Sequence, residues 1–239
     1  MKHRTSGPRI GLFGGTFNPI HLGHLRAAEE VREALGLDRI SFIPSRIPPH
    51  KQRGEINPIA SADQRLDWVE RAVAVHENFS IDRIEIDREG PSYLVDTLTA
   101  VRERDPDAVA PVFIVGEDAF AEMGEWREPE RIFTLADFAV MTRPPGQLSN
   151  LEERMPTIVK GAFGFEENGR KARHTRAGTQ IDLVPITALD ISSSKIREAC
   201  REERSIQFLV PESVREAIEK SGEYGPRPSG RGAGGSKRK

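Results

Sequence analysis

Short apolar runs alternate with amphipathic stretches along most of the chain. Residues 9–13, 40–44 and 111–115 are runs of the length and apolar content expected of buried strands. The stretches that follow them place apolar residues at helical spacing. Strands that alternate with helices in this way form a parallel sheet with helices on both faces. The pattern therefore predicts an α/β fold with a doubly wound parallel sheet.

Cap and stop signals set the bounds of the predicted helices. The first helix is predicted over 22–35 and ends at Gly36, which suits the left-handed position after a helix. Ser61 and Gln64 form a capping box for a helix that runs to about residue 76. Ser92 is predicted to cap a helix through residue 104, which Pro106 terminates. Further strands are predicted over 79–86, 137–142 and 180–186, and further helices over 193–203 and 211–221.

The length of 239 residues suits one domain, which we predict over 9–224. Within it, residues 161–178 are polar, basic and rich in glycine, so we expect a surface insertion or a mobile loop there. A small C-terminal helical part is expected from about residue 187. Residues 1–8 and the low-complexity stretch 225–239 are predicted to be disordered tails.

The charge balance argues against a polyanionic or membrane partner. The net charge is -2, and the last fifteen residues hold five Lys or Arg and no acid. The rest of the chain holds 30 basic and 37 acidic residues, so any phosphate site must be built locally. We therefore expect no nucleic acid and no membrane as partners. The single cysteine, Cys200, allows no intramolecular disulfide, and the chain starts without an apolar leader, which together favour a cytoplasmic location.

The segment GGTFNPIHLGHL, residues 14–25, directly follows the first predicted strand. Ligands of open α/β sheets bind beyond the carboxyl ends of the strands, so a site is expected here. Gly14 and Gly15 let the backbone turn sharply and approach an anion, and the following helix presents N–H groups. His21 and His24, spaced i, i+3, can both donate hydrogen bonds to phosphate oxygens. The glycine spacing differs from that of the common phosphate and dinucleotide loops, and no third ligand is spaced for zinc.

This segment resembles the G-[TS]-F-[DN]-P-x-H-x-G-H signature of the nucleotidyltransferase superfamily. The resemblance implies a Rossmann-like domain in which His21 and His24 hold the α-phosphate of a nucleoside triphosphate. They would also stabilise charge as pyrophosphate leaves. Many relatives have Asp where this chain has Asn18, but Asn also occurs there.

Further stretches resemble the nicotinate-nucleotide adenylyltransferase branch in the same order along the chain. FIPSRIPPHKQ, residues 42–52, resembles the P-x-x-x-P-P-H-K loop, in which His50 and Lys51 can approach phosphates. GPSYLVDTL, residues 90–98, resembles S-Y-T-x-D-T-L, whose helix start supplies backbone groups to the nicotinate carboxylate. Leu94 replaces the usual Thr, and a backbone N–H survives that change.

Two matches concern the sugar and the pyridine ring. Gly116, Glu117 and Asp118 follow an apolar strand and resemble the G-x-D of the family, whose acid meets sugar hydroxyls. Trp126 matches the tryptophan that stacks on the pyridine ring in this branch, and Arg127 departs from the aromatic residue beside it in some relatives.

The stretch ISSSKIR, residues 191–197, resembles I-S-S-T-x-I-R, the second diagnostic motif of the superfamily. Ser193 and Ser194 would lie at the start of a helix whose N–H groups and hydroxyls can bind triphosphate oxygens. Arg197, one turn on, would add a charge-assisted pair.

The resemblance implies adenylyl transfer from ATP to nicotinate mononucleotide, which gives deamido-NAD and pyrophosphate in NAD biosynthesis. A Mg²⁺ ion would be carried with ATP, since the sequence offers no metal cage of its own. The catalytic residues implied are His21, His24, Lys51 and Arg197. The ATP-binding residues implied are Gly14, Gly15, Thr16, Phe17, His21, His24, Gly116, Asp118, Ile191, Ser193, Ser194 and Arg197. The residues implied to bind nicotinate mononucleotide are Thr16, Asn18, His50, Lys51, Ser92, Tyr93, Leu94, Asp96, Thr97 and Trp126.

Several alternatives stay open at this point. A sibling enzyme would use nicotinamide mononucleotide, or phosphopantetheine, although phosphopantetheine enzymes are shorter and usually carry Thr where this chain has His21. A nucleotide-sensing protein without catalysis is a different class, as is an oxidoreductase, which lacks its glycine fingerprint here. The sequence leaves a homo-oligomer open.

Overall fold

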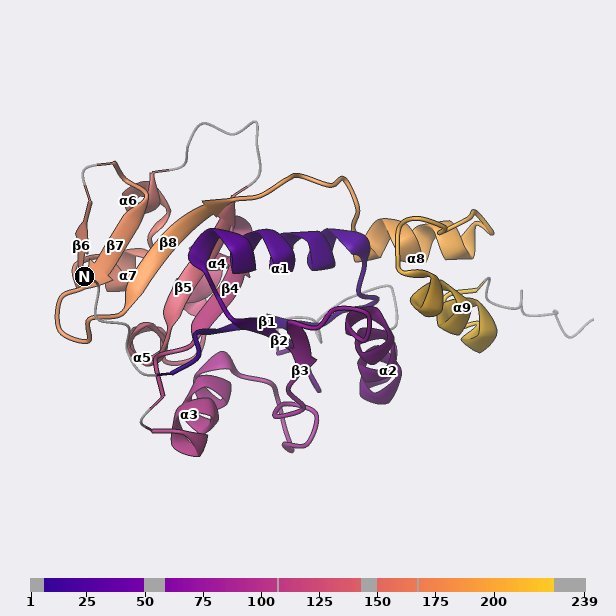
Figure 1. Cartoon of the computed structure of the whole chain (residues 1–239), viewed down its shortest axis with the longest axis horizontal. Coiled ribbons are helices and arrows are strands. Elements are labelled where there is room, and N and C mark those ends of the chain that lie inside the picture. The colour runs from indigo at the N-terminus through magenta and orange to yellow at the C-terminus, as the bar shows by residue number, and fades with distance from the viewer. Residues whose placement is uncertain (1–6, 50–58, 107, 143–149, 167, 226–239) are drawn as a thin grey trace, which may run out of the picture.

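The computed structural model describes residues 7–49, 59–106, 108–142, 150–166 and 168–225. These residues form an eight-stranded sheet in the order β3-β2-β1-β4-β5-β8-β7-β6 (Figure 1). The six strands from β3 to β8 pair in parallel, and β7 and β6 add two antiparallel strands at the far edge. The strand bounds are β1 Ile10–Gly15, β2 Arg39–Pro44, β3 Phe79–Ile81, β4 Val112–Gly116, β5 Asp137–Thr142, β6 Phe163–Phe165, β7 Lys171–His174 and β8 Gln180–Pro185. The predicted doubly wound parallel sheet is confirmed.

Helices cover both faces of the sheet, as the alternating pattern predicts. The helix bounds are α1 Leu22–Leu35, α2 Ala62–Val73, α3 Leu94–Arg104, α4 Glu117–Glu122, α5 Pro129–Leu135, α6 Leu151–Arg154, α7 Thr157–Lys160, α8 Ser193–Arg201 and α9 Glu212–Ser221, with a 3-10 turn η1 at Met123–Glu125. In Figure 1, α1 and α3 lie on opposite sides of the strands. Among the described residues no helix is long and apolar enough to cross a membrane.

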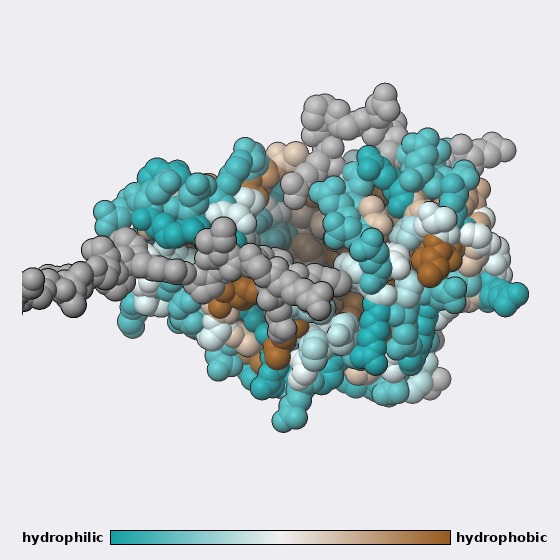
Figure 2. Space-filling view, turned by 180° about the vertical axis from the view of Figure 1, so that it is seen from behind, coloured by the Kyte–Doolittle hydropathy of each residue, from teal (hydrophilic) through white to brown (hydrophobic). Residues whose placement is uncertain are grey.

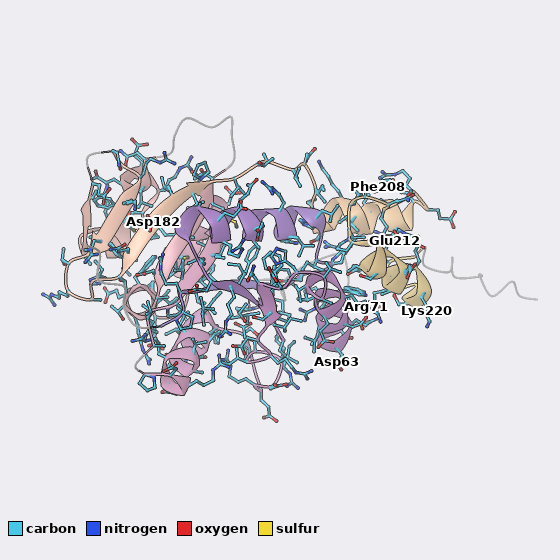
Figure 3. The ribbon with its side chains drawn as sticks, viewed as in Figure 1. Asp63, Arg71, Asp182, Phe208, Glu212 and Lys220 are labelled. Atoms are coloured by element: carbon cyan, nitrogen blue, oxygen red, sulfur yellow. The ribbon has the colours of Figure 1, made fainter. Side chains whose placement is uncertain are left out.

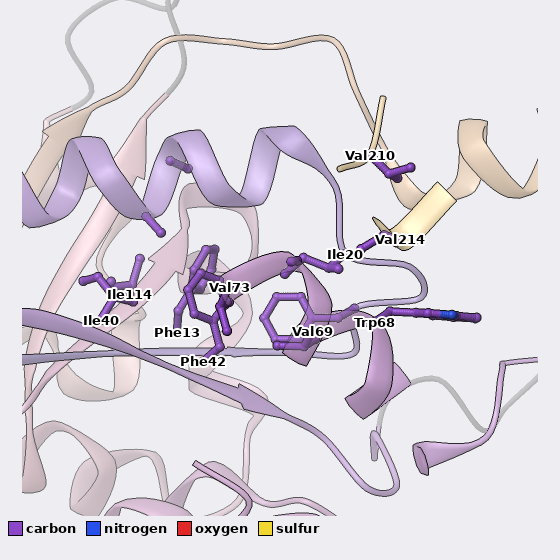
Figure 4. Close-up of a cluster of buried hydrophobic side chains, with 14 of the residues drawn as sticks. Phe13, Ile20, Ile40, Phe42, Trp68, Val69, Val73, Ile114, Val210 and Val214 are labelled. Carbon is purple, nitrogen blue, oxygen red and sulfur yellow. The ribbon is translucent and has the colours of Figure 1, made fainter. Parts of the chain in front are cut away.

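Two apolar clusters fill the space between sheet and helices. The first joins β1 and β2 to α1, α2, α8 and α9, and its fully buried members include Phe42, Trp68 and Val214 (Figure 4). The second joins the other face of the sheet to α3, α4 and α5 through residues such as Leu98 and Phe133. The central strands β1 and β4 are therefore buried on both faces, which explains their continuous apolar sequence.

The strand predicted over 79–86 is shorter in the structure, because β3 ends at Ile81. The Asp82 side chain accepts a hydrogen bond from the backbone N–H of Ile84 at 3.0 Å, and the backbone N–H of Asp87 donates to the carbonyl of Arg83 at 2.9 Å. These local bonds turn the chain away from the sheet. The alternation that continues to residue 86 belongs to turns rather than to a strand.

The prediction of a mobile loop over residues 161–178 is wrong where the structure forms β6 and β7, whereas the alternative of a surface insertion stays a prediction. This hairpin extends the sheet beyond β8, and its inward side chains, Phe163 and Ala172, are buried. The outward Lys171 pairs with Asp182 of β8 at 2.9 Å. The segment has a polar, basic composition because one face of the hairpin meets solvent.

The predicted helical part at the C-terminal end is present as α8 and α9, which lie beside α2 at one end of the sheet (Figure 1). The hydroxyl of Ser213 donates to the carbonyl of Arg71 in α2 at 3.3 Å. Asp63, Arg71, Glu212 and Lys220 mark the solvent side of α2 and α9 in Figure 3. Seen from behind, the surface is mostly hydrophilic, with a hydrophobic hollow near its middle (Figure 2).

Candidate active site

The strand order reverses between β1 and β4, which are neighbours in the sheet although the chain visits β2 and β3 between them. Loops that leave two such strands diverge and open a crevice at their carboxyl ends, where α/β proteins bind ligands. Two cavities lie at this edge of the sheet, one on each side of the end of β1. We call them the His cleft and the Trp pocket.

The His cleft is a cavity of about 390 Å³ between α1, the start of α4 and the start of α8. Its lining residues are Phe13, His21, Gly23, His24, Ala27, Gly116, Glu117, Asp118, Met141, Ile186, Thr187, Leu189, Ile191, Ser192 and Ser193. The structure thus brings together the three predicted segments around residues 21–24, 116–118 and 191–193. These segments are far apart in the sequence, and parallel strand topology places them at one edge.

The imidazole rings of His21 and His24 stack in the cleft, with centroids 3.6 Å apart and ring planes 23° apart. The backbone N–H of His21 donates to Nδ1 of His24 at 3.2 Å. The ring of His24 also meets the edge of Phe17, at 5.2 Å between centroids. These contacts hold both rings at the start of α1, where N–H groups and the helix dipole favour an anion.

Gly23 leaves room for the first of these rings. A Cβ atom at this position would lie 3.0 Å from Nδ1 and 3.1 Å from Cε1 of His21. The glycine between the two histidines is thus required by the close packing of the His21 ring on the backbone of α1.

The start of α8 closes the other side of the cleft. The Ser192 hydroxyl caps this helix by accepting from the N–H of Lys195 at 3.2 Å. The hydroxyl of Ser193 donates to the carbonyl of Pro19 at 2.8 Å and so ties α8 to the loop after β1. Two helix N-termini therefore meet at one cavity, which concentrates positive potential there without a net basic charge on the protein.

Arg197 lies behind this wall rather than on it. Its guanidinium is 8% exposed and donates to the carbonyl of Asn18 at 2.7 Å and to the hydroxyl of Ser194 at 3.1 Å. The Asn18 side-chain oxygen accepts from the Tyr224 hydroxyl and from the N–H of Ala60. In this structure Arg197, Ser194 and Asn18 thus stabilise the loop after β1 and do not line the cleft.

The predicted sharp turn at Gly14 and Gly15 is not found, because both residues belong to β1 and have no positive φ. The left-handed residue of the loop is Phe17, with φ of 48°, and its side chain is 3% exposed in the core. A Cβ atom at Gly15 would lie 2.9 Å from the Phe17 ring. Gly15 is therefore explained by the close approach of that ring rather than by a turn.

The Trp pocket is a cavity of about 180 Å³ on the other side of the end of β1. Its lining residues are Gly14, Gly15, Thr16, Ile43, Ser45, Pro48, Pro49, Glu85, Ser92, Tyr93, Leu94, Phe113, Trp126, Arg127 and Ile132. Five of the residues predicted to bind nicotinate mononucleotide, Thr16, Ser92, Tyr93, Leu94 and Trp126, are on this list. Three described residues of that set do not line the pocket: Asp96 and Thr97 lie next to it, and Asn18 is buried in the loop after β1.

Contacts around the pocket explain these positions. Thr97 is 1% exposed and donates to Glu85, whereas Asp96 pairs with Arg127 at 3.7 Å. The guanidinium of Arg127 also lies 4.9 Å from the centre of the Tyr93 ring. The predicted cap of α3 by Ser92 is not found. The Ser92 hydroxyl instead accepts from the backbone N–H of Arg46 at 3.0 Å.

Sequence reasoning missed two polar groups in this pocket. The Glu85 carboxyl is 7% exposed, and burial raises its pKa to about 7, while hydrogen bonds from Thr97 and Ser92 and the charge of Arg88 act in the opposite direction. The Ser45 hydroxyl is buried and has no hydrogen-bond partner among the described residues. Glu85 lies outside the motifs and Ser45 occupies a variable position of one, so only the folded structure shows that they line the same cavity.

A third missed residue, Arg65, connects the loops that build the site. It is 1% exposed and donates to four carbonyls, those of Ala60 at 3.0 Å, Thr16 at 2.8 Å, Ser45 at 2.6 Å and Arg46 at 3.0 Å. Burial lowers the pKa of this guanidinium, which still stays charged at neutral pH. One side chain thus fixes the loop after β1, the loop after β2 and the approach to α2.

His50 and Lys51 lie outside the described residues. Where the structure does describe the chain, no group of three His, Cys, Asp or Glu side chains could hold a metal ion. At the mouth of the His cleft, Glu117 pairs with Arg154 at 2.9 Å. These side chains therefore do not form a protein-built cage for a divalent ion.

A larger cavity, about 840 Å³, lies away from this edge, at the amino ends of β1 and β2. Four of its charged side chains pair with each other, Arg104 with Asp82 and Arg83 with Asp87. The topology and the histidine pair favour the carboxyl edge as the reactive site.

Comparison with known proteins gives consistent relatives. The family described as cytidylyltransferase-like matches residues 12–199. The probable nicotinate-nucleotide adenylyltransferase of Trichlorobacter lovleyi is 44% identical over 219 residues, which cover 91% of this chain and 100% of that protein. The protein of the same name from Geotalea uraniireducens is 41% identical over 217 residues, with 90% and 98% covered.

A solved structure shows the same fold. It is that of Plasmodium falciparum nicotinic acid mononucleotide adenylyltransferase complexed with NaAD, which aligns with a TM-score of 0.67 and 17% identity. The alignment covers 91% of this chain and 97% of that chain.

Proposed function

The chain belongs to the nicotinate-nucleotide adenylyltransferase family, within the cytidylyltransferase-like proteins, and on this premise we propose that it transfers the adenylyl group of ATP to nicotinate mononucleotide. The products are deamido-NAD and pyrophosphate, so the reaction is a step of NAD biosynthesis. The observation that carries the proposal is the stacked histidine pair at the meeting point of two helix N-termini, next to a pocket lined by an aromatic ring.

The His cleft is the proposed site of ATP. Its volume of about 390 Å³ is in the range of small-molecule sites. His21, His24 and the N–H groups of α1 and α8 offer donors for triphosphate oxygens, and Asp118 at the start of α4 offers an acceptor for sugar hydroxyls.

The Trp pocket is the proposed site of the pyridine ring of nicotinate mononucleotide. Trp126, Phe113 and Ile132 supply apolar surface, and the start of α3 supplies N–H groups for a carboxylate. Leu94 is the first residue of α3, so the departure from Thr changes a side chain and leaves a helix N–H in place.

The two cavities meet at the end of β1, where Phe13 lines one and Gly14 lines the other. When the pyridine ring of the acceptor lies in the Trp pocket, its ribose phosphate can therefore reach the α-phosphate of ATP in the His cleft. An oxygen of that phosphate attacks the α-phosphorus of ATP in line, the new O–P bond forms, and the bond from the α-phosphorus to the bridging oxygen breaks. Pyrophosphate leaves with the electron pair, and no protein side chain becomes covalently modified.

Catalysis then consists of positioning and of charge neutralisation. His21 and His24 are proposed to donate hydrogen bonds to the oxygens that gain charge. Arg197 is proposed to add positive charge from behind the loop after β1, where it is fixed by Asn18 and Ser194. Lys51, together with His50, is proposed to contact phosphates from the loop after β2.

We also propose that ATP carries a divalent ion, Mg²⁺, into the site. The ion neutralises triphosphate charge when bound. The cytoplasmic location and a homo-oligomer stay predictions.

The test is an assay of pyrophosphate and dinucleotide formation with ATP and each of three acceptors: nicotinate mononucleotide, nicotinamide mononucleotide and phosphopantetheine. We expect the highest kcat/KM with nicotinate mononucleotide. A preference for either of the other acceptors would assign the chain to a sibling activity. ATP binding without product from any acceptor would instead indicate a nucleotide sensor.

A further inference from the structure

We infer that Glu85 is the residue by which the Trp pocket distinguishes a carboxylate from an amide on the pyridine ring: protonated Glu85 accepts the carboxylate and ionised Glu85 rejects it. The inference rests on the proposed function, because it concerns the second substrate of that reaction. It adds a determinant of specificity that lies outside every motif in the sequence.

The walls of the Trp pocket differ in polarity. Ile43, Phe113, Trp126 and Ile132 supply apolar surface, against which an aromatic ring can pack. Ser45, Glu85 and Ser92 supply the polar side chains of the lining, together with Thr16 and the partly exposed Arg127. A ring substituent that is charged or strongly polar must face these groups, because a buried carboxylate without polar partners is costly.

Glu85 is held at this wall by contacts on both sides. Thr97 of α3 donates to its Oε1 at 2.7 Å, and Ser92 donates to the same carboxyl from the turn before α3. Thr97 in turn accepts from Arg88 at 3.1 Å. Since Thr97 and Ser92 both also bond to backbone or arginine partners, the carboxyl has little freedom to rotate out of the pocket.

The charges that face Glu85 come from every element around it. Arg88 and Asp82 lie on its own segment, Arg65 on α2, Arg46 after β2 and Arg127 across the pocket. The guanidinium groups of Arg65 and Arg46 donate hydrogen bonds to backbone carbonyls, and Arg127 pairs with Asp96. None of these described cations forms an ion pair with Glu85, so burial remains the largest influence on its protonation.

The pH dependence expected for binding of nicotinate mononucleotide follows from the raised pKa of Glu85. Burial raises the pKa of Glu85 to about 7, so the carboxyl is protonated below neutral pH and ionised above it. The protonated form has an O–H that donates to a nicotinate carboxylate, whereas the ionised form places two like charges in one small pocket. A nicotinamide amide carries no charge and offers an N–H donor, so ionised Glu85 does not repel it.

The experiment measures binding of nicotinate mononucleotide and of nicotinamide mononucleotide to the full chain between about pH 6 and about pH 8.5. The readout is the ratio of the two Kd values, with the kcat/KM ratio beside it. Both ligands carry the same ribose phosphate and meet the same histidines, so titration of those groups cancels in the ratio. We expect the preference for nicotinate mononucleotide to fall by roughly ten-fold across this range in the wild-type protein.

Two variants separate Glu85 from the rest of the chain. Glu85→Gln removes the titration and keeps a similar shape, so we expect a ratio that does not change with pH. Glu103→Gln, an exposed acid on α3, is the matched control and should keep the wild-type slope. Circular dichroism and thermal unfolding check that both variants fold.

The possible outcomes are distinguishable. A ratio in the wild-type protein that is independent of pH overturns the inference without any variant, and so does an unchanged slope in a folded Glu85→Gln protein. Dinucleotide formation at pH 7 is measured in the same preparation. Failure to form it from either mononucleotide contradicts the proposed function itself, whereas formation with a flat ratio contradicts the role of Glu85 alone.

Discussion

At the scale of single residues, one backbone hydrogen bond selects the tautomer of His24. Because Nδ1 accepts from the N–H of His21 at 3.2 Å, a neutral His24 carries its proton on Nε2. Nε2 is then the nitrogen that can donate to a phosphate oxygen, in the role proposed for His24. The same contact orients the ring, so the i, i+3 spacing of the histidines sets both the position of the His24 ring and its tautomer.

Loss of this donor should affect the chemical step more than folding. We expect His24→Ala to reduce kcat by about 100-fold or more, by analogy with removal of one donor to a developing oxyanion. Steady-state kinetics measures this effect, and thermal unfolding should give a Tm close to that of the wild type. His76→Ala, whose partly exposed ring stacks on Phe79 and lines neither cavity, is the control and should keep full turnover. Near-normal turnover of His24→Ala would contradict the assignment.

A methyl group at Gly23 tests the position of the other ring. The added Cβ lies 3.0 Å from Nδ1 of His21, so the ring must move by a few tenths of an ångström. We expect Gly23→Ala to lower kcat by about ten-fold with a native-like fold, because misplaced catalytic groups lose rate steeply. Gly161→Ala, where a Cβ meets nothing within 4 Å, serves as the comparison. Equal kcat values for the two variants would show that the exact place of His21 is unimportant.

The residues that sequence reasoning identified share one property. His21, His24 and Ser193 lie in short continuous motifs, so their spacing in the sequence determines their local arrangement in the structure. Glu85 lies outside the motifs and Ser45 occupies a variable position of one; each becomes part of the site through neighbours more than ten residues away, such as Thr97 for Glu85. Their importance depends on burial, which a single sequence does not display.

At the scale of elements, the site is built from loops that one helix holds together. Arg65 is on the buried face of α2, and its fork of donors reaches carbonyls after β1 and after β2. A planar guanidinium offers five N–H donors in a wide, rigid fork, whereas an ammonium group offers three donors from a single nitrogen. The alignment of the two loops therefore depends on the side chain of a helix that contributes no residue to either cavity.

Arg65→Lys should separate charge from geometry. It keeps the positive charge and leaves buried carbonyls without donors, so we expect the free energy of unfolding to fall by about 2 kcal/mol or more. Urea unfolding measures the loss. Arg71→Lys on the exposed face of the same helix, where the ion pair with Asp67 contributes little, should change stability by less than about 1 kcal/mol. Similar losses in both variants would argue against the bridging role.

Element prediction from sequence succeeded where periodicity and caps agreed. The helix predicted over 22–35 is α1, and the capping box of Ser61 and Gln64 is present at the start of α2. It failed where side chains bonded to the local backbone, as at Asp82, or where a strand had only one buried face, as in β7. In both cases tertiary contacts or turn chemistry outweighed the pattern of apolar residues.

At the scale of the whole molecule, the C-terminal part returns to the first loop. Tyr224, just after α9, packs on Trp68 at 5.5 Å between ring centroids and donates its hydroxyl to Asn18. Burial raises the pKa of this phenol, so it remains a donor at all ordinary pH values. This contact joins residues 206 positions apart and ties the C-terminal part to the loop after β1.

Removal of the Tyr224 hydroxyl should weaken this link between the C-terminal part and the loop after β1. We expect Tyr224→Phe to lower the free energy of unfolding by about 1 kcal/mol, since Asn18 keeps its second donor from Ala60. The KM for ATP should rise by about three-fold as the loop after β1 becomes less fixed. Denaturant unfolding and steady-state kinetics give the two values, and Lys220→Gln on the exposed side of α9 provides the reference. If KM stays constant while stability falls, the contact supports the fold alone.

The meeting of two separate cavities at the end of β1 has a consequence for how such an enzyme can evolve or be redesigned. The walls of the His cleft come from residues around 21–24, 116–118 and 186–193, whereas the far walls of the Trp pocket come from residues 43–49, 85–94 and 126–132. With ATP in the His cleft and the mononucleotide in the Trp pocket, as proposed, mutations in the second set would change which mononucleotide is accepted and leave the residues around ATP intact. The architecture is therefore modular, and new acceptors can be selected without rebuilding the chemistry.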